Sequence, residues 1–109
     1  MSNDVRISEL MEKISVFCKD RDWDKYHNPK DLAVGMSTES NELLDMFRFV
    51  SEDESWKKMD DPGFRKHACE ELIDVLWFVL RFAERNGIDI EDAFDMKIAE
   101  NALKYPKSA

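Results

Sequence analysis

Apolar residues recur at helical spacing along most of the chain, and this spacing predicts four helices. The first is expected over residues 4–20, with one apolar face formed by Ile7, Leu10, Ile14 and Phe17. The others are expected over residues 29–50, over residues 64–85, and from a cap at Asp89 to about Tyr105. No segment alternates apolar and polar residues as a strand does, so the pattern predicts an all-α four-helix bundle.

The segments that break the helical pattern are polar. Three residues before the first helix can act as its caps: Ser2, Asn3 and Asp4. Residues 19–30 have no clear period and predict a loop rich in aromatic rings. The acidic residues 51–63, which end in a proline and a glycine, interrupt the pattern and predict a mobile connector.

The third predicted helix is apolar on nearly every side. Its circumference is covered by Leu72, Ile73, Val75, Leu76, Trp77, Phe78, Val79 and Leu80. A chain of 109 residues is expected to form one domain, residues 1–109, that buries about 65% of its unfolded surface. A single subunit can hardly cover such a helix, so the sequence predicts a homo-oligomer in which a second subunit supplies the missing wall.

The charge balance narrows the range of partners. The formal net charge is −8 and no basic run is present, which argues against a nucleic-acid groove and against an anionic membrane surface. Cys18 and Cys69 lack metal-binding spacing and suit small buried thiols in a reducing cytosol. The longest apolar run is too short to span a bilayer and no signal pattern is present, so we expect a cytoplasmic protein.

Two pairs of acidic residues lie where the helices are expected to be apolar. Glu39 falls on the apolar stripe of the second helix, and Asp74 lies within the apolar third helix. A buried carboxylate without a partner is costly, so it must be neutralised, paired or bound to a cation. Because residues three apart on a helix are neighbours, two carboxylate patches are expected, Glu39 with Glu42 and Glu71 with Asp74.

Together the two patches would suit Mg²⁺ or Mn²⁺, which prefer oxygen ligands and bridge to substrate phosphates. Such an ion polarises a phosphate, and a carboxylate not fully used as a ligand can orient or deprotonate the attacking water. The pattern therefore predicts a nucleotide site. The alternative is that the acids are solvated surface charges, as most are. A di-iron site is set aside because neither His27 nor His67 completes a Glu-x-x-His motif.

Three further groups of polar or aromatic residues each have two interpretations. The rings of the first loop could stack on a base or anchor the loop to the core: Trp23, Tyr26 and His27. A four-residue repeat on the last helix could offer donors to phosphate or sugar, or could be solvated surface: Lys97, Asn101 and Tyr105. His67 lies one turn before Glu71, where it could serve the site or lie on the surface.

These residues resemble a known family, the MazG-like all-α nucleoside triphosphate pyrophosphohydrolases, and in particular its dCTP pyrophosphatase branch. The family motif E-x-x-E followed by E-x-x-D reads here as Glu39-Ser-Asn-Glu42 and Glu71-Leu-Ile-Asp74. The segment RDWDKYHNPKDLA at residues 21–33 is similar to the family's R-D-W-x-x-F-H-x-P-x-x-L-A. NALKYP at residues 101–106 is similar to its closing N-x-x-x-Y-P, so the resemblance covers most of the chain.

The resemblance implies that a dNTP is cleaved between its α and β phosphates, giving dNMP and pyrophosphate, with dCTP the favoured substrate and nucleotide-pool cleansing the role. It implies that the four acids hold Mg²⁺ and are the catalytic residues. It places Trp23 and His27 near the base. It assigns to phosphate or sugar a further set, Lys97, Asn101 and Tyr105. It also implies a homodimer or a dimer of dimers.

The chain departs from the dCTP branch at two expected substrate-binding positions. Phe49 stands where a tryptophan is common, and Phe78 stands where a tyrosine is common. The base preference is therefore open, and a broad-specificity MazG-type enzyme is an alternative. A non-catalytic helical module that binds nucleotide or a partner protein is the alternative from another class, and complete acid pairs argue against it.

Overall fold

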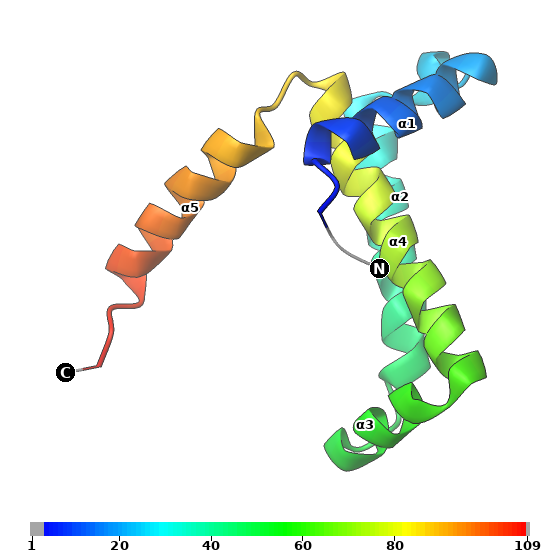
Figure 1. Cartoon of the computed structure of the whole chain (residues 1–109), viewed down its shortest axis with the longest axis vertical. Helices are drawn as coiled ribbons and strands as arrows, with labels where there is room; N and C mark the ends of the chain where they lie inside the picture. The colour runs from blue at the N-terminus through cyan, green and yellow to red at the C-terminus, as the bar shows by residue number, and fades with distance from the viewer. Residues whose placement is uncertain (1–3, 109) are drawn as a thin grey trace.

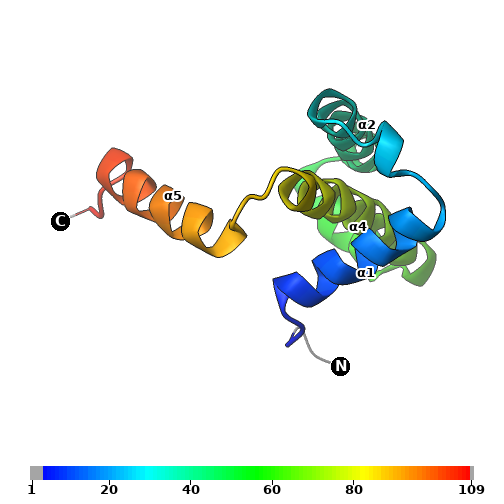
Figure 2. The ribbon, with the colours of Figure 1, turned by 90° about the horizontal axis from the view of Figure 1, so that it is seen from above.

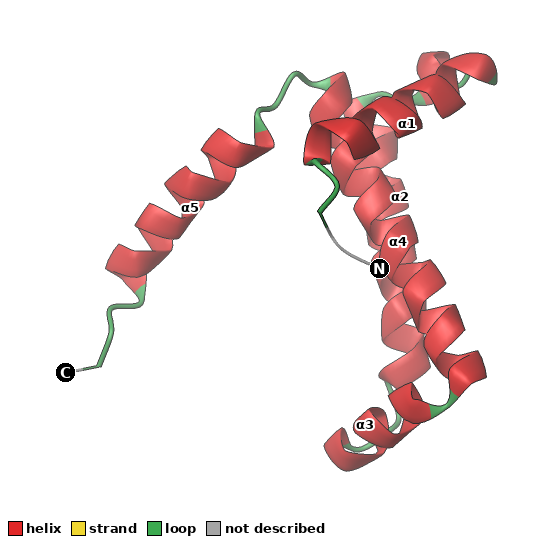
Figure 3. Ribbon diagram, viewed as in Figure 1, coloured by secondary structure: helices red, strands yellow, loops and turns green. Residues whose placement is uncertain are grey.

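The computed structural model describes residues 4–108, which are largely helical (Figures 1 and 3). The elements are α1 (Ile7–Asp20), the short 3₁₀ helix η1 (Asp24–Tyr26), α2 (Pro29–Phe47), α3 (Glu52–Asp60), α4 (Pro62–Arg85) and α5 (Ile90–Lys104). No strand occurs among these residues, so the predicted all-α class is confirmed. None of their helices is long and apolar enough to cross a membrane.

α2 and α4 run side by side in opposite directions, and α1 packs across the C-terminal half of α4 (Figures 1 and 2). The centre of this packing is formed by Ile14, Cys18 and Leu80, with Leu10, Met11, Leu76, Trp77 and Ile90 around them. On α2, Gly35 leaves room for the ring of Phe78, because a Cβ at this position would lie 2.6 Å from Phe78 Cζ. The missing side chain therefore allows α2 and α4 to approach closely next to the site described below.

Residues 51–63, expected to interrupt the helical pattern as a connector, instead form a further helix over most of their length, α3. Ser51 caps α3 by accepting a hydrogen bond from the backbone N–H of Glu54. Acidic residues fill the first turn of α3 and Lys57 and Lys58 its last, which suits the helix dipole. The charged residues that give this segment no apolar helical pattern thus stabilise a short helix.

The remaining helix boundaries differ by a few residues from those expected. α4 begins at Pro62, two residues earlier than predicted, because Asp61 caps it by accepting from the N–H of Phe64. α1 begins at Ile7, after Arg6, whose side chain makes no capping bond. Of the caps predicted for this helix, Ser2 and Asn3 lie outside the described residues.

α5 contacts the core through Ile90 at its start, and the rest of it projects away from the other helices (Figures 1 and 2). None of its residues is buried, and its exposed apolar side chains include Phe94, Met96, Ile98 and Leu103. α4 also leaves apolar side chains uncovered, among them Leu72, which is 55% exposed, and Ile73. The fourth predicted helix therefore exists, but within one chain it does not complete a closed bundle.

A buried arginine fastens the loop after α1 to α4. Arg81 is 1% exposed and is the one charged residue that is buried in the described part of the chain. Its Nε donates to Nδ1 of His27 at 2.9 Å, its Nη1 donates to Oε2 of Glu84 at 2.9 Å, and its Nη2 donates to Asp24. Arg85 adds bonds to the backbone carbonyls of Asp24 and His27. Because a buried charge is tolerated only when paired, this network holds η1 in place.

The close approach at Gly35 predicts an unusual response to alanine. In a helix interior, glycine to alanine normally stabilises by about 1 kcal/mol. Gly35→Ala should instead lower the free energy of unfolding, because overpacking against Phe78 costs about 1–3 kcal/mol. The control is Gly63→Ala in the first turn of α4, where a Cβ would meet only Asp61 Oδ2 at 3.5 Å. Urea unfolding that ranks Gly35→Ala at or above wild type would contradict this packing.

The network around Arg81 predicts a pH-dependent contribution from Asp24. The hydrogen bond from Arg81 lowers the pKa of Asp24. A lowered carboxyl pKa stabilises the fold above the unfolded-state pKa, and this stabilisation is lost as pH falls through the folded-state pKa. Asp24→Asn should therefore destabilise the protein at pH 7, and the difference from wild type should vanish in strong acid.

The matched control for this prediction is Asp22→Asn, two residues earlier. Asp22 has φ 57°, a conformation that asparagine also adopts, and its ion pair with Lys25 is exposed. Little change is expected from it at any pH. Melting curves across pH in which both variants behave alike would show that the buried guanidinium gives Asp24 no special role.

Candidate functional site

The packing of α2 against α4 brings acids from both predicted pairs to one place. Glu39 comes from α2, and Glu71 and Asp74 come from neighbouring turns of α4. One carboxylate oxygen from each lies within 4.8 Å of those of the other two. We call these three residues the acid cluster. Glu42 is exposed and does not belong to it.

The acid cluster is electrostatically unfavourable as it stands. Burial raises the pKa of Glu39, and the charges of Asp74, Glu71 and Glu42 raise it further. The ionised form of Glu39 is thus disfavoured both by lost hydration and by repulsion. Glu42 therefore acts on the cluster through its charge, although it is not one of the converging groups.

Glu71 provides a second sign that a partner is missing. Its side chain is 15% exposed, and its Oε1 accepts a hydrogen bond from Nε2 of His67 at 3.2 Å. Its Oε2 is buried and has no hydrogen-bond partner among residues 4–108. Buried polar atoms without partners are rare in proteins, and a cation held by the acid cluster would account for this one. An all-oxygen set of ligands fits Mg²⁺ or Mn²⁺.

Asp74 is not enclosed by apolar residues as the sequence predicted. Asp74 is exposed, and so are its neighbours Leu72 and Ile73. The other helices of one chain cover only part of α4, as expected for a helix that a single subunit can hardly cover. The case for Asp74 as a ligand depends instead on its closeness to Glu39 and Glu71.

A cleft of about 290 Å³ adjoins the acid cluster. Its walls are formed by Trp23, His27, Glu39, Asp74, Trp77 and Phe78. A larger hollow of about 380 Å³ lies along one side of α1, but no member of the acid cluster lines it. The smaller cleft is the one of these two that places aromatic rings beside members of the acid cluster, so we take it as the candidate site.

The aromatic wall of the cleft is held by ring contacts. Trp23 and Trp77 each pack edge-on against Phe17, with ring centroids 5.5 Å and 5.2 Å apart. The rings of Trp23 and His27 are 6.2 Å apart. Burial lowers the pKa of His27, and the nearby Arg81 and Arg85 lower it further, so this ring is neutral. Tyr26 is exposed and does not line the cleft.

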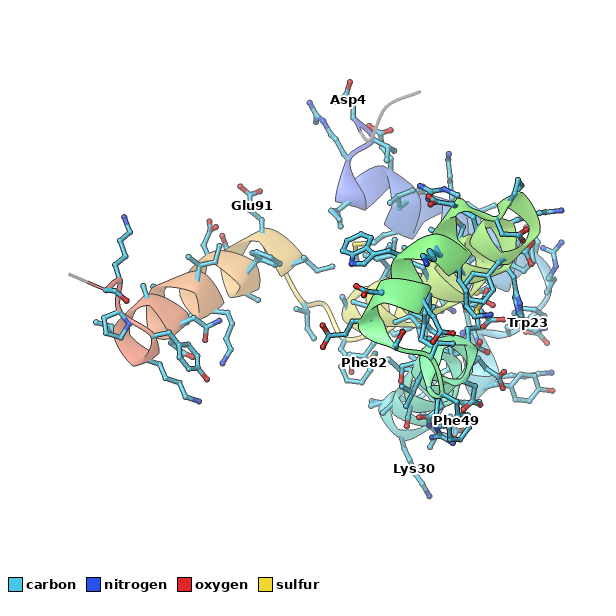
Figure 4. The ribbon with its side chains drawn as sticks, turned by 90° about the horizontal axis from the view of Figure 1, so that it is seen from below. Asp4, Trp23, Lys30, Phe49, Phe82 and Glu91 are labelled. Atoms are coloured by element: carbon cyan, nitrogen blue, oxygen red, sulfur yellow. The ribbon has the colours of Figure 1, made fainter. Side chains whose placement is uncertain are left out.

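Several residues predicted to bind substrate lie away from this cleft. Phe49 is 92% exposed beyond the end of α2. The polar repeat on the last predicted helix lies on or just after α5: Lys97, Asn101 and Tyr105. Figure 4 shows Glu91, in the first turn of α5, well apart from Trp23 and Phe49. Within one chain, the structure therefore joins Trp23, His27 and Phe78 to the acids, but not these four residues.

Three residues that shape the site escaped the sequence analysis. Trp77 lines the cleft, but it counted only as one of many apolar residues of its helix. Asp24 looked like one more charge in a polar loop. Arg81 carried a signal that could have been used, because a lone arginine directly after the apolar run of residues 75–80 requires a buried partner.

Comparisons with known proteins show which sequences this chain is similar to. The sequence matches no family model. It is 32% identical to dCTP pyrophosphatase 1 of Mus musculus over 90 residues, which is 83% of this chain and 53% of that protein. It is 27% identical to dCTP pyrophosphatase 1 of Bos taurus over 105 residues, 96% of this chain and 62% of that protein. The chain thus spans only 53–62% of these curated relatives' length.

A solved structure matches the chain over nearly its whole length. The crystal structure of a pyrophosphatase from Archaeoglobus fulgidus has a TM-score of 0.87 and 33% sequence identity, covering 98% of both chains. This likeness extends well beyond the residues of the acid cluster. The chain therefore belongs to the MazG-like all-α pyrophosphatase family, in the branch that resembles dCTP pyrophosphatase 1.

Proposed function

We propose that this chain is a nucleoside triphosphate pyrophosphohydrolase that converts a dNTP, with dCTP favoured, to the monophosphate and pyrophosphate in a Mg²⁺-dependent reaction. The observation that carries the proposal is the convergence of Glu39, Glu71 and Asp74 within 4.8 Å beside an aromatic cleft. The choice of dCTP follows the curated relatives, four of which are named dCTP pyrophosphatase 1. A broad-specificity enzyme is the alternative, since Phe49 and Phe78 depart from the branch.

In this proposal the acid cluster holds the ion, and Mn²⁺ can replace Mg²⁺. When bound, the ion supplies charge neutralisation and polarises the phosphate oxygens. Glu42 lies one turn from Glu39 on α2 and remains outside the cluster, so its carboxylate is free to orient and deprotonate a water. The hydrogen bond from His67 to Oε1 of Glu71 fixes this carboxylate and leaves its Oε2 for the ion.

The other end of the cleft suits the base. Trp23 and Trp77 supply aromatic surface that does not depend on base identity, and one stacked base contributes about 1–3 kcal/mol. Phe78 adds a further apolar wall to the same cleft. A nucleotide lying along the cleft would thus place its phosphates at the carboxylates and its base against the rings.

We further propose that a second copy of the chain completes the structure, as a homodimer or a dimer of dimers. The uncovered apolar residues of α4 and α5, such as Leu72 and Phe94, would be buried against that copy. Because α5 lies away from the cleft of its own chain, it would carry its polar residues to a partner's site: Lys97, Asn101 and Tyr105. The proposed site would then be shared between subunits.

The reaction is tested with a pair of adjacent glutamates. Glu71→Gln should lower the rate of pyrophosphate release from dCTP by more than about 100-fold, since even outer-shell partners of a metal cost 10–100-fold. Glu70→Gln makes the same charge change one residue earlier, outside the cluster, and should keep the rate. EDTA should abolish release by wild type. Pyrophosphate release from a dNTP panel that is absent in wild type, or equal in both variants, would contradict the proposal.

Melting curves test the ion separately from the chemistry. Mg²⁺ should raise the Tm of wild type and of Glu70→Gln, because a ligand stabilises the state that binds it. Glu71→Gln should lose most of that shift, yet in EDTA it should be as stable as wild type or more so, since one repelling charge is gone. A full Mg²⁺ shift in Glu71→Gln would remove Glu71 from the ligand set.

The proposed assembly predicts complementation between two inactive variants. Glu71→Gln and Lys97→Ala should each be impaired alone, but refolding them together should restore activity through mixed dimers that contain one intact site. If co-refolding restores no activity, α5 does not contribute to the site of a partner subunit. Sedimentation of wild type as a 12.8 kDa monomer at micromolar concentration would contradict the assembly itself.

A further inference from the structure

The contact between Arg81 and His27 determines which ring nitrogen carries the proton. A guanidinium group remains charged and can only donate hydrogen bonds. Arg81 Nε lies 2.9 Å from Nδ1 of His27, so Nδ1 must accept. A neutral imidazole has one donor and one acceptor nitrogen, and its proton must therefore be on Nε2.

The surroundings of His27 keep the ring in this form. Two cations on α4 face it, Arg81 and Arg85, and two acids offset them, Asp24 on η1 and Glu84 on α4. Both acids bond to Arg81 and neither is bonded to the ring. Burial lowers the pKa of His27, and the guanidinium of Arg81 lowers it further. The carboxylates across the cleft belong to the acid cluster.

We propose that Arg81 is a positioning residue that holds His27 as the neutral Nε2–H tautomer, so that this ring offers the substrate a hydrogen-bond donor and no acceptor. His27 lines the cleft, and Nε2 is the ring nitrogen left for a ligand. The role in substrate selection rests on the proposed function. The ring would donate a hydrogen bond to a carbonyl oxygen or an unprotonated ring nitrogen of a base, and it could accept none from an exocyclic amino group.

Nitrogen-15 NMR of the imidazole rings reads this tautomer directly, without turnover. The chain has two histidines, so His27→Gln assigns the signals and His67 is an internal reference. In wild type, the His27 ring should show its proton on Nε2 and an unprotonated Nδ1 at neutral pH. A proton on Nδ1, or a charged ring, would overturn the proposal without any further variant.

Two arginines of α4 provide a matched pair of variants. Arg81→Met removes the ring contact, whereas Arg85→Met removes bonds to backbone carbonyls of the same loop and leaves the ring contact. Arg81→Met should yield a mixture of tautomers and a raised His27 pKa, because Asp24 and Glu84 remain after the cation is lost. Arg85→Met should keep the Nε2–H form. Equal ring spectra in the two variants would overturn the proposal.

Arg81→Lys decides the matter if Arg81→Met does not fold. Lysine keeps a charge for Asp24 and Glu84 but lacks the Nε–H that faces the ring, so the tautomer should again become mixed. An unchanged His27 spectrum in folded Arg81→Lys would show that charge alone is sufficient and would overturn the tautomer role.

Kinetics connect the tautomer to substrate selection. Because only the Nε2–H form can donate to the substrate, mixing of the tautomers in Arg81→Lys should raise KM for dCTP by about 2-fold for an equal mixture, with kcat nearly unchanged. A loss confined to kcat would overturn the selection role. If wild type hydrolyses no nucleotide, the proposed function fails, while the NMR result still tests what Arg81 does to His27.

Discussion

One face of α4 carries acidic side chains near its middle and a buried arginine toward its end, and the rest of the structure depends on how these opposite charges are paired. Glu71 and Asp74 lie near its middle, Arg81 lies two turns beyond Asp74, and Phe78 lies between them on the same face. The cation is satisfied within the chain by Asp24, Glu84 and His27. The acids meet a third acid from α2, and no lysine or arginine among residues 4–108 pairs with them. The arginine at one end of this face therefore has its partners within the chain, whereas the acids at the other end require a cation.

The sequence predicts where most of the helices lie, but not which of their apolar faces are buried within one chain. Apolar spacing located α1, α2, α4 and α5 to within a few residues, because their buried faces repeat at helical intervals. It could not locate α3, whose stability comes from Ser51 and the charges at its two ends. Nor could it show that α5 leaves the bundle, because an exposed apolar residue such as Phe94 has the same pattern as a buried one.

The candidate site is likewise predictable where it depends on local spacing and not where it depends on helix packing. The acids were recognisable because Glu39 interrupts an apolar stripe, and local spacing is enough to place neighbours on one helix. Which acids converge depends on the packing of α2 and α4 at Gly35, which no local pattern encodes. For this reason Glu42 was grouped with the others, although it lies outside the cluster, and the pairing of Arg81 with a loop over fifty residues earlier was missed.

In the proposed site, the acid cluster binds a divalent ion within the same cleft as the aromatic loop. Paramagnetic broadening by Mn²⁺ tests it in one NMR titration, because the chain has three tryptophans in distinct places. Trp23 and Trp77 line the cleft with Glu39 and Asp74, and Trp56 lies on α3 outside it. If Mn²⁺ binds at the acid cluster, the indole signals of Trp23 and Trp77 should disappear first, well before that of Trp56. Simultaneous loss of all three, or earliest loss of Trp56, would contradict it.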